Sequence, residues 1–181
     1  MPRLIVIDSY SHMFGEAVLD RLHPGLKAEV YKSLITTRIA KATKKSREKA
    51  KRGKIVWSGK NFNDPLGKEL RSKGWTRRKV FYPNQERYYI DVDYAKGGVA
   101  VEAQFGKYAF VQHDFAKFRY LFEMKDASLR IDVGIEIVPS AALQKKMYSG
   151  VSNFDSVVAS LQAHARNDPP VPIWLLAIDV N

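Results

Sequence analysis

Residues 88–107 read YYIDVDYAKGGVAVEAQFGK, and this stretch predicts a β-hairpin. Two runs rich in β-branched and aromatic residues flank the pair Gly97-Gly98. Paired glycines between two such runs are typical of a two-residue hairpin loop. With that loop, counting back along both strands places Asp93 directly opposite Glu102.

The second strand of this hairpin has one polar and one apolar side. Because side chains alternate along a strand, Glu102 and Gln104 point to one face of the sheet. The apolar residues point to the other face: Val101, Ala103 and Phe105. We expect the apolar set to lie in the core, so that the polar pair projects from a rigid strand.

Two carboxylates that face each other across a hairpin repel, and a divalent cation would offset that repulsion. Asp93 and Glu102 offer the oxygen ligands that Mg²⁺ prefers, and Mg²⁺ retains waters that can attack a phosphorus atom. The backbone carbonyl of Ala103 is a third candidate ligand. Gln104 carries no charge, so we assign it the orientation of water or phosphate. The alternative is an ordinary polar hairpin face without a metal.

The composition favours oxygen ligands for any metal. The chain of 181 residues has no cysteine, which excludes disulfides and thiolate sites and suits a reducing cytoplasm. No two of the four histidines lie four residues apart, so a histidine-zinc motif has no support: His12, His23, His113 and His164. No apolar run is long enough to span a membrane, and the N-terminus resembles a first strand more than a secretory signal.

The net charge of +11 is unevenly distributed along the chain. Residues 1–79 hold 20 Lys and Arg against 7 Asp and Glu, whereas residues 80–181 hold 10 against 12. This imbalance predicts a polyanionic partner that is gripped by the first part. The most basic stretch, 38–54, has no bulky apolar face for a membrane, which favours nucleic acid. We expect this stretch to be a solvated helix or a loose loop that orders on DNA. Its candidate phosphate contacts include Lys44, Lys45 and Arg47.

The order of predicted elements indicates an α/β fold with a mixed central β-sheet flanked by helices. Strands are expected at 3–8, 54–57, 88–93, 99–105, 131–138 and 173–178. Helices are expected at 13–22, 26–35, 64–73, 112–125 and 153–166. With no repeat or linker, residues 1–181 form one predicted domain. Its first part, 1–79, would be a basic helical portion that grips DNA, and 80–181 would carry the catalytic sheet.

The hairpin and its neighbours resemble the restriction endonucleases of the BglII/BstYI type, which are related to BamHI. The resemblance rests on Asp93 followed nine residues later by Glu102-Ala-Gln104-Phe, on Gly106-Lys107-Tyr108, and on 131–139, IDVGIEIVP. It covers most of the chain and is strongest over 88–155. Two further segments fit it: Ser9–His12 and Ser149–Ser152. These enzymes carry the wider nuclease motif Asp-x(n)-Glu-x-Lys with glutamine in place of lysine.

The resemblance implies a restriction-endonuclease-like core and a homodimer that closes around palindromic double-stranded DNA. It also implies Mg²⁺ as cofactor, recognition sites with a GATC core, and cuts that leave four-base 5′ overhangs. Asp93 would bind the metal and Glu102 would organise the metal-bound water. Gln104 would take the position that lysine has elsewhere.

The resemblance also implies where bases are read. In relatives, base contacts come from the loop after the Glu-x-Gln strand and from a loop after the following strand. In this sequence those loops supply Lys107, Ser149, Ser152 and Asn153. Lys107 would donate to guanine in the major groove, with a phosphate contact as the alternative. Arg78 precedes the hairpin, and we assign it a phosphate contact.

Two other functions stay open at this point. One is a DNA-binding module without catalysis, in which the hairpin carboxylates are surface charge. The other is a repair or recombination nuclease without site preference. His113-Asp114 could form a general base pair, but we expect a structural role at a helix start. Asp132 and Glu136 lie on one strand face and could hold a second metal, but we expect them to pair with Lys or Arg or to lie at a dimer surface. The three tryptophans are expected core anchors: Trp57, Trp75 and Trp174.

Overall fold

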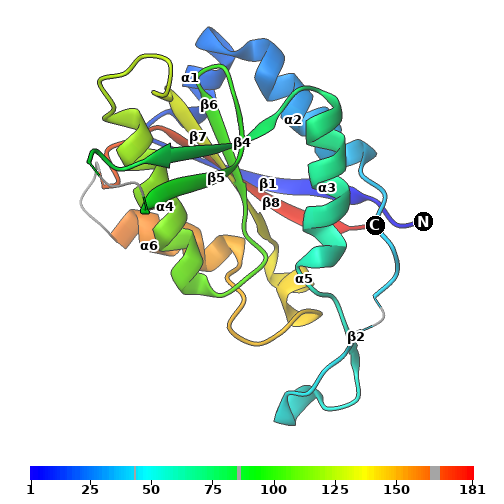
Figure 1. The fold of residues 1–181 in the computed structure, drawn as a ribbon. Helices are drawn as coiled ribbons and strands as arrows, with labels where there is room; N and C mark the ends of the chain where they lie inside the picture. Colours follow the sequence, from blue (N-terminus) through cyan, green and yellow to red (C-terminus); the bar gives the residue numbers. More distant parts are fainter. Residues whose placement is uncertain (43, 85–86, 164–167) are drawn as a thin grey trace.

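The computed structural model describes residues 1–42, 44–84, 87–163 and 168–181. Its centre is a six-stranded mixed sheet in the order β1-β8-β7-β6-β5-β4 (Figure 1). The strands are β1 (Leu4–His12), β4 (Thr76–Phe81), β5 (Tyr89–Lys96), β6 (Val99–Ala103), β7 (Val133–Pro139) and β8 (Ile173–Val180). Strands β6, β7 and β8 run parallel, and the other neighbours pair antiparallel. The predicted α/β class with a mixed central sheet is confirmed.

Helices cover both faces of this sheet (Figure 1). One face carries α1 (Gly15–Leu22), α2 (Pro24–Thr36) and α3 (Lys60–Ser72). The other face carries α4 (Tyr108–Phe122) and α6 (Phe154–Ala163), and the short helix α5 (Ala141–Lys145) follows β7. None of the described helices has both the length and the apolar character needed to cross a membrane.

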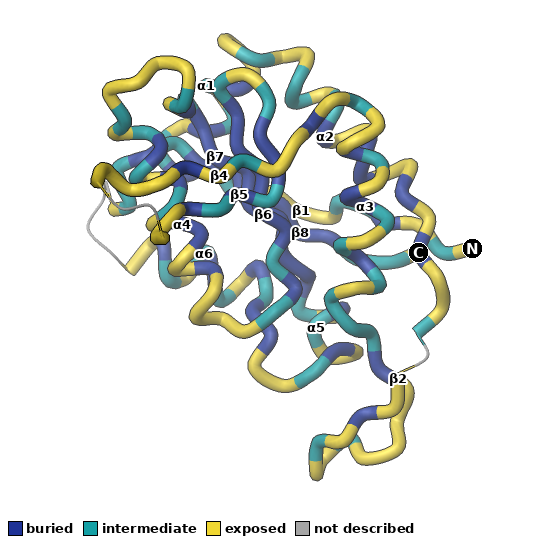
Figure 2. The backbone as a smooth tube through the Cα atoms, viewed as in Figure 1, coloured by how far each residue is buried: buried dark blue, intermediate teal, exposed yellow. Residues whose placement is uncertain are grey.

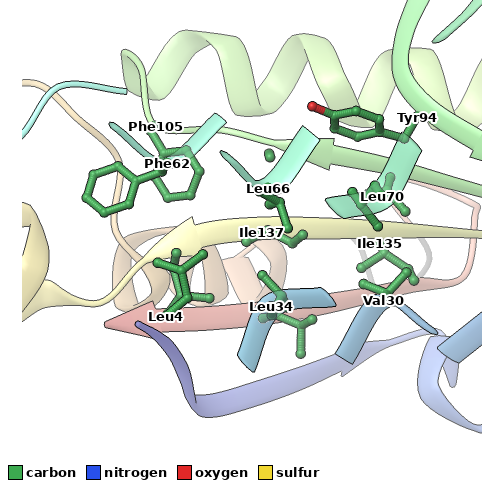
Figure 3. Packing of buried hydrophobic residues seen from close by; sticks show 14 of the residues in the cluster. Leu4, Val30, Leu34, Phe62, Leu66, Leu70, Tyr94, Phe105, Ile135 and Ile137 are labelled. Carbon is green, nitrogen blue, oxygen red and sulfur yellow. The ribbon is translucent and has the colours of Figure 1, made fainter. Parts of the chain in front are cut away.

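Two hydrophobic clusters fill the space between the sheet and the helices. The cluster under α2 and α3 joins residues from both ends of the chain, including Leu4, Leu34, Leu66 and Ile137 (Figure 3). The second cluster packs α4 and α6 against the opposite face of the sheet. Burial is therefore greatest along the central strands (Figure 2). Trp75 and Trp174 lie in the core as predicted, whereas Trp57 is half-buried.

The predicted hairpin is present as β5 and β6, joined at Gly97-Gly98. Lys96 faces Val99, as the two-residue loop requires, and Tyr94 faces Val101. Gly97 has a φ of 56°, a conformation that glycine adopts without steric cost. The register predicted from the sequence is therefore confirmed where the two strands pair.

Two helix predictions were wrong in detail. We expected a helix that starts at Asp64-Pro65, but α3 begins at Lys60 and contains Pro65. The reason is packing: Phe62, one turn before Leu66, stacks on Phe105 with ring centroids 4.9 Å apart. The predicted end of this helix is confirmed, since Gly74 follows it with a φ of 84°. On α2, Ile35 was expected inside but is 40% exposed.

Strand β7 does not lie near the edge of the sheet, as its alternating charges suggested. It is flanked by β6 and β8, and all seven of its residues are buried. The helix predicted over 153–166 is observed as α6, and residues 164–166 lie outside the described residues.

The described part of the basic stretch contains no α-helix and is mainly loop. Two short strands, β2 (Lys44–Lys45) and β3 (Ile55–Val56), pair as a ribbon with a 3₁₀ turn η1 (Lys49–Lys51) between them. This basic arm, residues 44–56, projects from the body of the protein and is largely exposed (Figures 1 and 2). Like charges three and four residues apart oppose a helix here.

Gly15 tests how tightly α1 packs on the sheet. A Cβ atom at this position would overlap the backbone of Ile173 in β8, and backbone cannot move aside like a flexible side chain. We expect Gly15→Ala to lower the free energy of unfolding by about 1–3 kcal/mol, the usual cost of overpacking. Urea denaturation measures this change.

Gly25→Ala is the matched control, because a Cβ atom at Gly25 has no neighbour within 4 Å. Gly25 lies in α2, where alanine should be neutral or stabilising by up to about 1 kcal/mol. Equal stability of the two variants would show that α1 does not approach β8 as described.

Candidate active site

Asp93 and Glu102 come together on the sheet face that α4 covers. The strand pairing of the hairpin ends at Tyr94 and Val101, and Asp93 and Glu102 lie one residue beyond this last pair on their two strands. The negative charge of Asp93 also contributes to the raised pKa of Glu102, as expected for neighbouring carboxyl groups.

A β-bulge in β5 lies beside Asp93. Strand β4 pairs Thr76 with Ala95 but Arg78 with Val92, so β5 has one extra residue over this interval. The side-chain alternation changes there as well: Val92 packs under α4, whereas Tyr94 packs under α3. Bulges of this kind re-aim a side chain and are frequent next to active sites.

Glu102 is a buried carboxyl group, with only 2% of the residue exposed. Burial raises the pKa of Glu102 well above its usual range, and the charges of Asp114 and Asp93 add to the rise. The ammonium group of Lys117 acts in the opposite direction. An ionised Glu102 therefore needs a positive charge beside it.

Helix α4 supplies that charge within a buried polar cluster of Glu102, Lys117, Asp114 and Gln104. Lys117 Nζ donates to Glu102 Oε1 at 2.8 Å and to Asp114 Oδ1 at 2.7 Å. Asp114 Oδ2 accepts from Gln104 Nε2 at 2.8 Å. Gln104 Oε1 accepts from the backbone N–H of Gly106 at 2.9 Å. Burial opposes the charged form of Lys117, but the two carboxylates outweigh it and raise the pKa of Lys117.

Glu136 is a further acidic group next to this cluster. It pairs in register with Glu102 across β6 and β7 and is fully buried, and neither of its side-chain oxygens has a hydrogen-bond partner among the described residues. Burial raises the pKa of Glu136 well above its usual value, and Asp114 and Glu102 raise it further. The prediction that Glu136 pairs with Lys or Arg was wrong.

The residues present fit a hard cation such as Mg²⁺. Lys117 brings one positive charge to a region with four acidic side chains: Asp93, Glu102, Asp114 and Glu136. Among the described residues, Lys117 is the cation that contacts Glu102 and Asp114, and neither side-chain oxygen of Glu136 has a hydrogen-bond partner. In the described part of the chain, no three His, Cys, Asp or Glu side chains are grouped closely enough to form a metal site by themselves. A cation would therefore use two carboxylates, a backbone carbonyl and water, which suits Mg²⁺.

Sequence reasoning gave Asp114 a structural role and did not single out Lys117. We expected a helix start at His113-Asp114, but α4 begins at Tyr108, so both charges lie in the middle of the helix. One signal was available: Asp114 falls on the same helical face as the buried residues Val111, Phe115 and Phe118. A charge on an apolar stripe must find a partner.

The two loops predicted to read bases lie next to each other. Lys107 forms an isolated β-bridge with Val151, and Tyr108 N donates to Gly150 O at 3.0 Å. Ser152 N donates to Gly106 O at 3.3 Å. The loop after β6 and the loop before α6 therefore form one edge of the molecule, directly beyond Gln104.

The basic arm is anchored to this same edge. Ser149 donates through N and Oγ to Glu48, at 2.9 and 2.8 Å to Oε1. Lys51 Nζ donates to the carbonyls of Lys145 and Met147. Lys44 lies 4.7 Å from the centre of the Tyr148 ring. The arm and the predicted base-reading loop are thus one connected surface.

Not every predicted DNA contact is exposed. Lys107, Ser149, Lys44, Lys45 and Arg47 are exposed. In contrast, the hydroxyl of Ser152 is buried, and the described part of the chain offers it no hydrogen-bond partner.

Two of the remaining candidates have structural partners. Asn153 Oδ1 accepts from Ser156 N at 3.1 Å and so caps the start of α6. Arg78 donates to the carbonyl of Leu129 at 3.2 Å. The side chains of Lys107 and the arm are therefore the better placed of the predicted contacts.

Two solved structures with a similar fold are those of a restriction endonuclease. The crystal structure of restriction endonuclease BglII complexed with a DNA 16-mer has a TM-score of 0.77 at 19% identity, over 97% of this chain and 77% of that chain. The crystal structure of free BglII has a TM-score of 0.67 at 18% identity, over 97% and 78%. A comparison with curated protein sequences yields no match. The family model "Restriction endonuclease BglII/BglIII" matches residues 7–178, and the chain therefore belongs to this family of site-specific deoxyribonucleases.

Proposed function

We propose that this protein is a Mg²⁺-dependent endonuclease in which Asp93 and Glu102 hold the cation together with the backbone carbonyl of Ala103. The observation that carries the proposal is the buried Glu102, whose pKa is raised by burial and by the neighbouring carboxyl groups of Asp114 and Asp93. Carboxylates are rarely buried in excess unless a cation or a proton compensates them.

The side chains have distinct roles in this proposal. Bound Mg²⁺ would supply an acidified water and a positive charge for the scissile phosphate. Glu102 is fixed by Lys117 and by its buried strand, so it can orient that water without moving. Asp93 is only partly buried, which leaves its carboxylate accessible from the DNA side. Gln104 holds Asp114 and Gly106 in place, so we assign it a positioning role.

The partner is double-stranded DNA, bound by a homodimer at a short palindrome. The family supports DNA as substrate, and the BglII relative was crystallised with a DNA 16-mer. We propose a site with a GATC core, four-base 5′ overhangs, and base contacts from Lys107 and residues 149–153. The basic part of residues 1–79 would grip phosphates while residues 80–181 carry the chemistry. The absence of cysteine is consistent with a cytoplasmic enzyme.

Digestion of plasmid DNA with and without Mg²⁺ separates this proposal from its two rivals. A site-specific enzyme gives discrete fragments, and sequencing their ends reads the recognition site and the overhang. A nuclease without site preference gives a smear. A binding module without catalysis leaves the plasmid intact, which would reject the proposal.

The role of Glu102 is tested by Glu102→Gln, which keeps the shape of the side chain and removes its charge. We expect the cleavage rate at saturating DNA and Mg²⁺ to fall by about 100-fold or more, because the ligand that orients the water is lost. Binding of the same duplex in EDTA, measured by gel shift, should be retained.

Glu123→Gln is the matched control, since Glu123 is half exposed at the end of α4 and pairs with Arg119. This variant should cut like the wild type. Full cleavage by Glu102→Gln would remove Glu102 from the active site.

The pH dependence of Mg²⁺ binding follows from the raised pKa of Glu102. A proton occupies the carboxyl group below that pKa, so Mg²⁺ must displace it, and metal affinity rises with pH. We expect the half-saturating Mg²⁺ concentration for cleavage to fall by up to about tenfold per pH unit between about pH 6.5 and 8.5. The control is DNA binding in EDTA over the same range. A half-saturating concentration that does not change with pH would contradict a protonated Glu102.

The basic arm is tested by replacing Lys44, Lys45, Arg47 and Lys49 with glutamine. We expect weaker binding to all sequences and a flatter dependence of log K on log salt, by about 0.9 for each phosphate that the arm no longer neutralises. A control with the same reduction in charge replaces exposed cations outside residues 1–79: Arg87, Arg119, Lys125 and Arg130. If both quadruple variants have the wild-type salt slope, the arm does not contact phosphates.

A further inference from the structure

Lys117 is a buried cation that the Glu-x-Gln motif does not account for. Its side chain is only 13% exposed and lies against the proposed metal ligand Glu102. An ammonium group has three N–H donors. Two of them are directed to Glu102 and Asp114, which leaves one for a further acceptor.

Gln104 cannot supply the charge that a lysine at its position would bring. It is neutral, its oxygen accepts from Gly106 N, and one of its amide hydrogens is directed to Asp114. The cationic group of the site is instead Lys117 on α4. It lies 15 residues after Glu102 in sequence and donates a hydrogen bond to the Glu102 side chain.

We propose that Lys117 is a further catalytic residue, which donates its third N–H to a non-bridging oxygen of the scissile phosphate. The proposal rests on the proposed function. Three observations carry it: Lys117 touches Glu102, its ammonium group has an unused donor, and the site otherwise gathers acidic groups that repel phosphate. Lys117 keeps all its protons and forms no covalent bond, so its contribution is electrostatic.

Asp114 is the positioning residue for this contact. It accepts from Lys117 on one oxygen and from Gln104 on the other, so both groups have a fixed orientation before DNA binds. Asp114 is itself 2% exposed, which excludes competing water. Fixed donors of this kind need no reorganisation when charge develops on the phosphate.

A merely structural lysine would only neutralise Glu102, and a binding experiment without metal distinguishes the two roles. Two duplexes carry the recognition site, which is identified by sequencing the cut ends. One has ordinary phosphates at both scissile positions, and the other has neutral methylphosphonates there. Binding is measured in EDTA for Glu102→Gln and for Glu102→Gln combined with Lys117→Met. The Glu102→Gln background removes the buried charge that Lys117 would otherwise leave unpaired.

We expect the methylphosphonate to weaken binding by about 10-fold or more in Glu102→Gln, the usual effect of one hydrogen bond to a charged group. It should have little effect once Lys117 is replaced as well. An equal methylphosphonate effect in both proteins would overturn the proposal, since Lys117 would then not touch that phosphate.

Cleavage gives a second measurement. At saturating DNA and Mg²⁺ we expect Lys117→Met to cut about 100-fold more slowly than the wild type, with partial recovery in Lys117→Arg. The control is Lys125→Met, an exposed lysine just beyond α4. Thermal melting identifies variants that fail to fold. If Lys117→Met is one of them, the methylphosphonate binding experiment in the Glu102→Gln background decides the role of Lys117.

The outcomes separate this inference from the proposed function. A wild-type protein that does not cut DNA with Mg²⁺ rejects both. A wild-type protein that cuts, together with a Lys117→Met variant that cuts equally well, rejects the role of Lys117 alone. Slow cleavage by Lys117→Met with an unchanged methylphosphonate effect would also reject it, leaving Lys117 as a structural partner of Glu102.

Discussion

The burial of the Glu102 carboxyl group under α4 is the constraint on which the rest of the site depends. Taking a carboxylate out of water costs several kcal/mol, and the protein recovers this only through close partners. Lys117 and Asp114 are placed by α4 to meet that requirement. The same burial raises the pKa of Glu102 and makes the site favourable for a cation. Burial of Glu102 therefore lowers the stability of the fold but favours the binding of a cation.

The topology explains why the required groups meet in one place. Strands β6 and β7 are parallel, so the chain must cross the sheet between them, and α4 makes that crossing. The helix starts at the carboxyl end of β6, beside Gln104, and runs back over Glu102. The loops that follow β6 and β7 emerge at the same edge, where Lys107 bridges Val151. Ligand sites of open sheets commonly form at such carboxyl ends.

The hairpin could be predicted from sequence because its information is local. Gly97-Gly98 forms the loop, and the loop fixes the register of the paired residues as far as Tyr94 and Val101. Asp93 and Glu102 lie one residue beyond this last pair. The mixed sheet followed in the same way from the order of elements. The family resemblance added expected roles for Asp93, Glu102 and Gln104. It did not indicate that Lys117 and Asp114 contact these residues.

The partners of Glu102 depend on contacts between residues far apart in the fold, and these escaped prediction. Nothing local says that Lys117 on α4 reaches β6, or that Glu136 lies in a central strand. The ribbon of the basic arm was not predicted because it is held by Ser149 and by the carbonyls of Lys145 and Met147, about a hundred residues away in sequence.

The separation of charge along the chain resolves a conflict inherent in this site. An acidic centre repels the phosphate that it must bind, whereas a uniformly basic centre could not hold Mg²⁺. Here the first 79 residues carry the positive charge and the last 102 carry the acidic cluster. Exposed charges act over about 10 Å at ordinary ionic strength, so the arm attracts DNA from outside the pocket. At the proposed site, Lys117 is within hydrogen-bond distance of Glu102 and Asp114, and a bound Mg²⁺ would offset the remaining acidic groups. The residues that attract DNA from a distance therefore differ from those that offset the charge of the buried carboxylates.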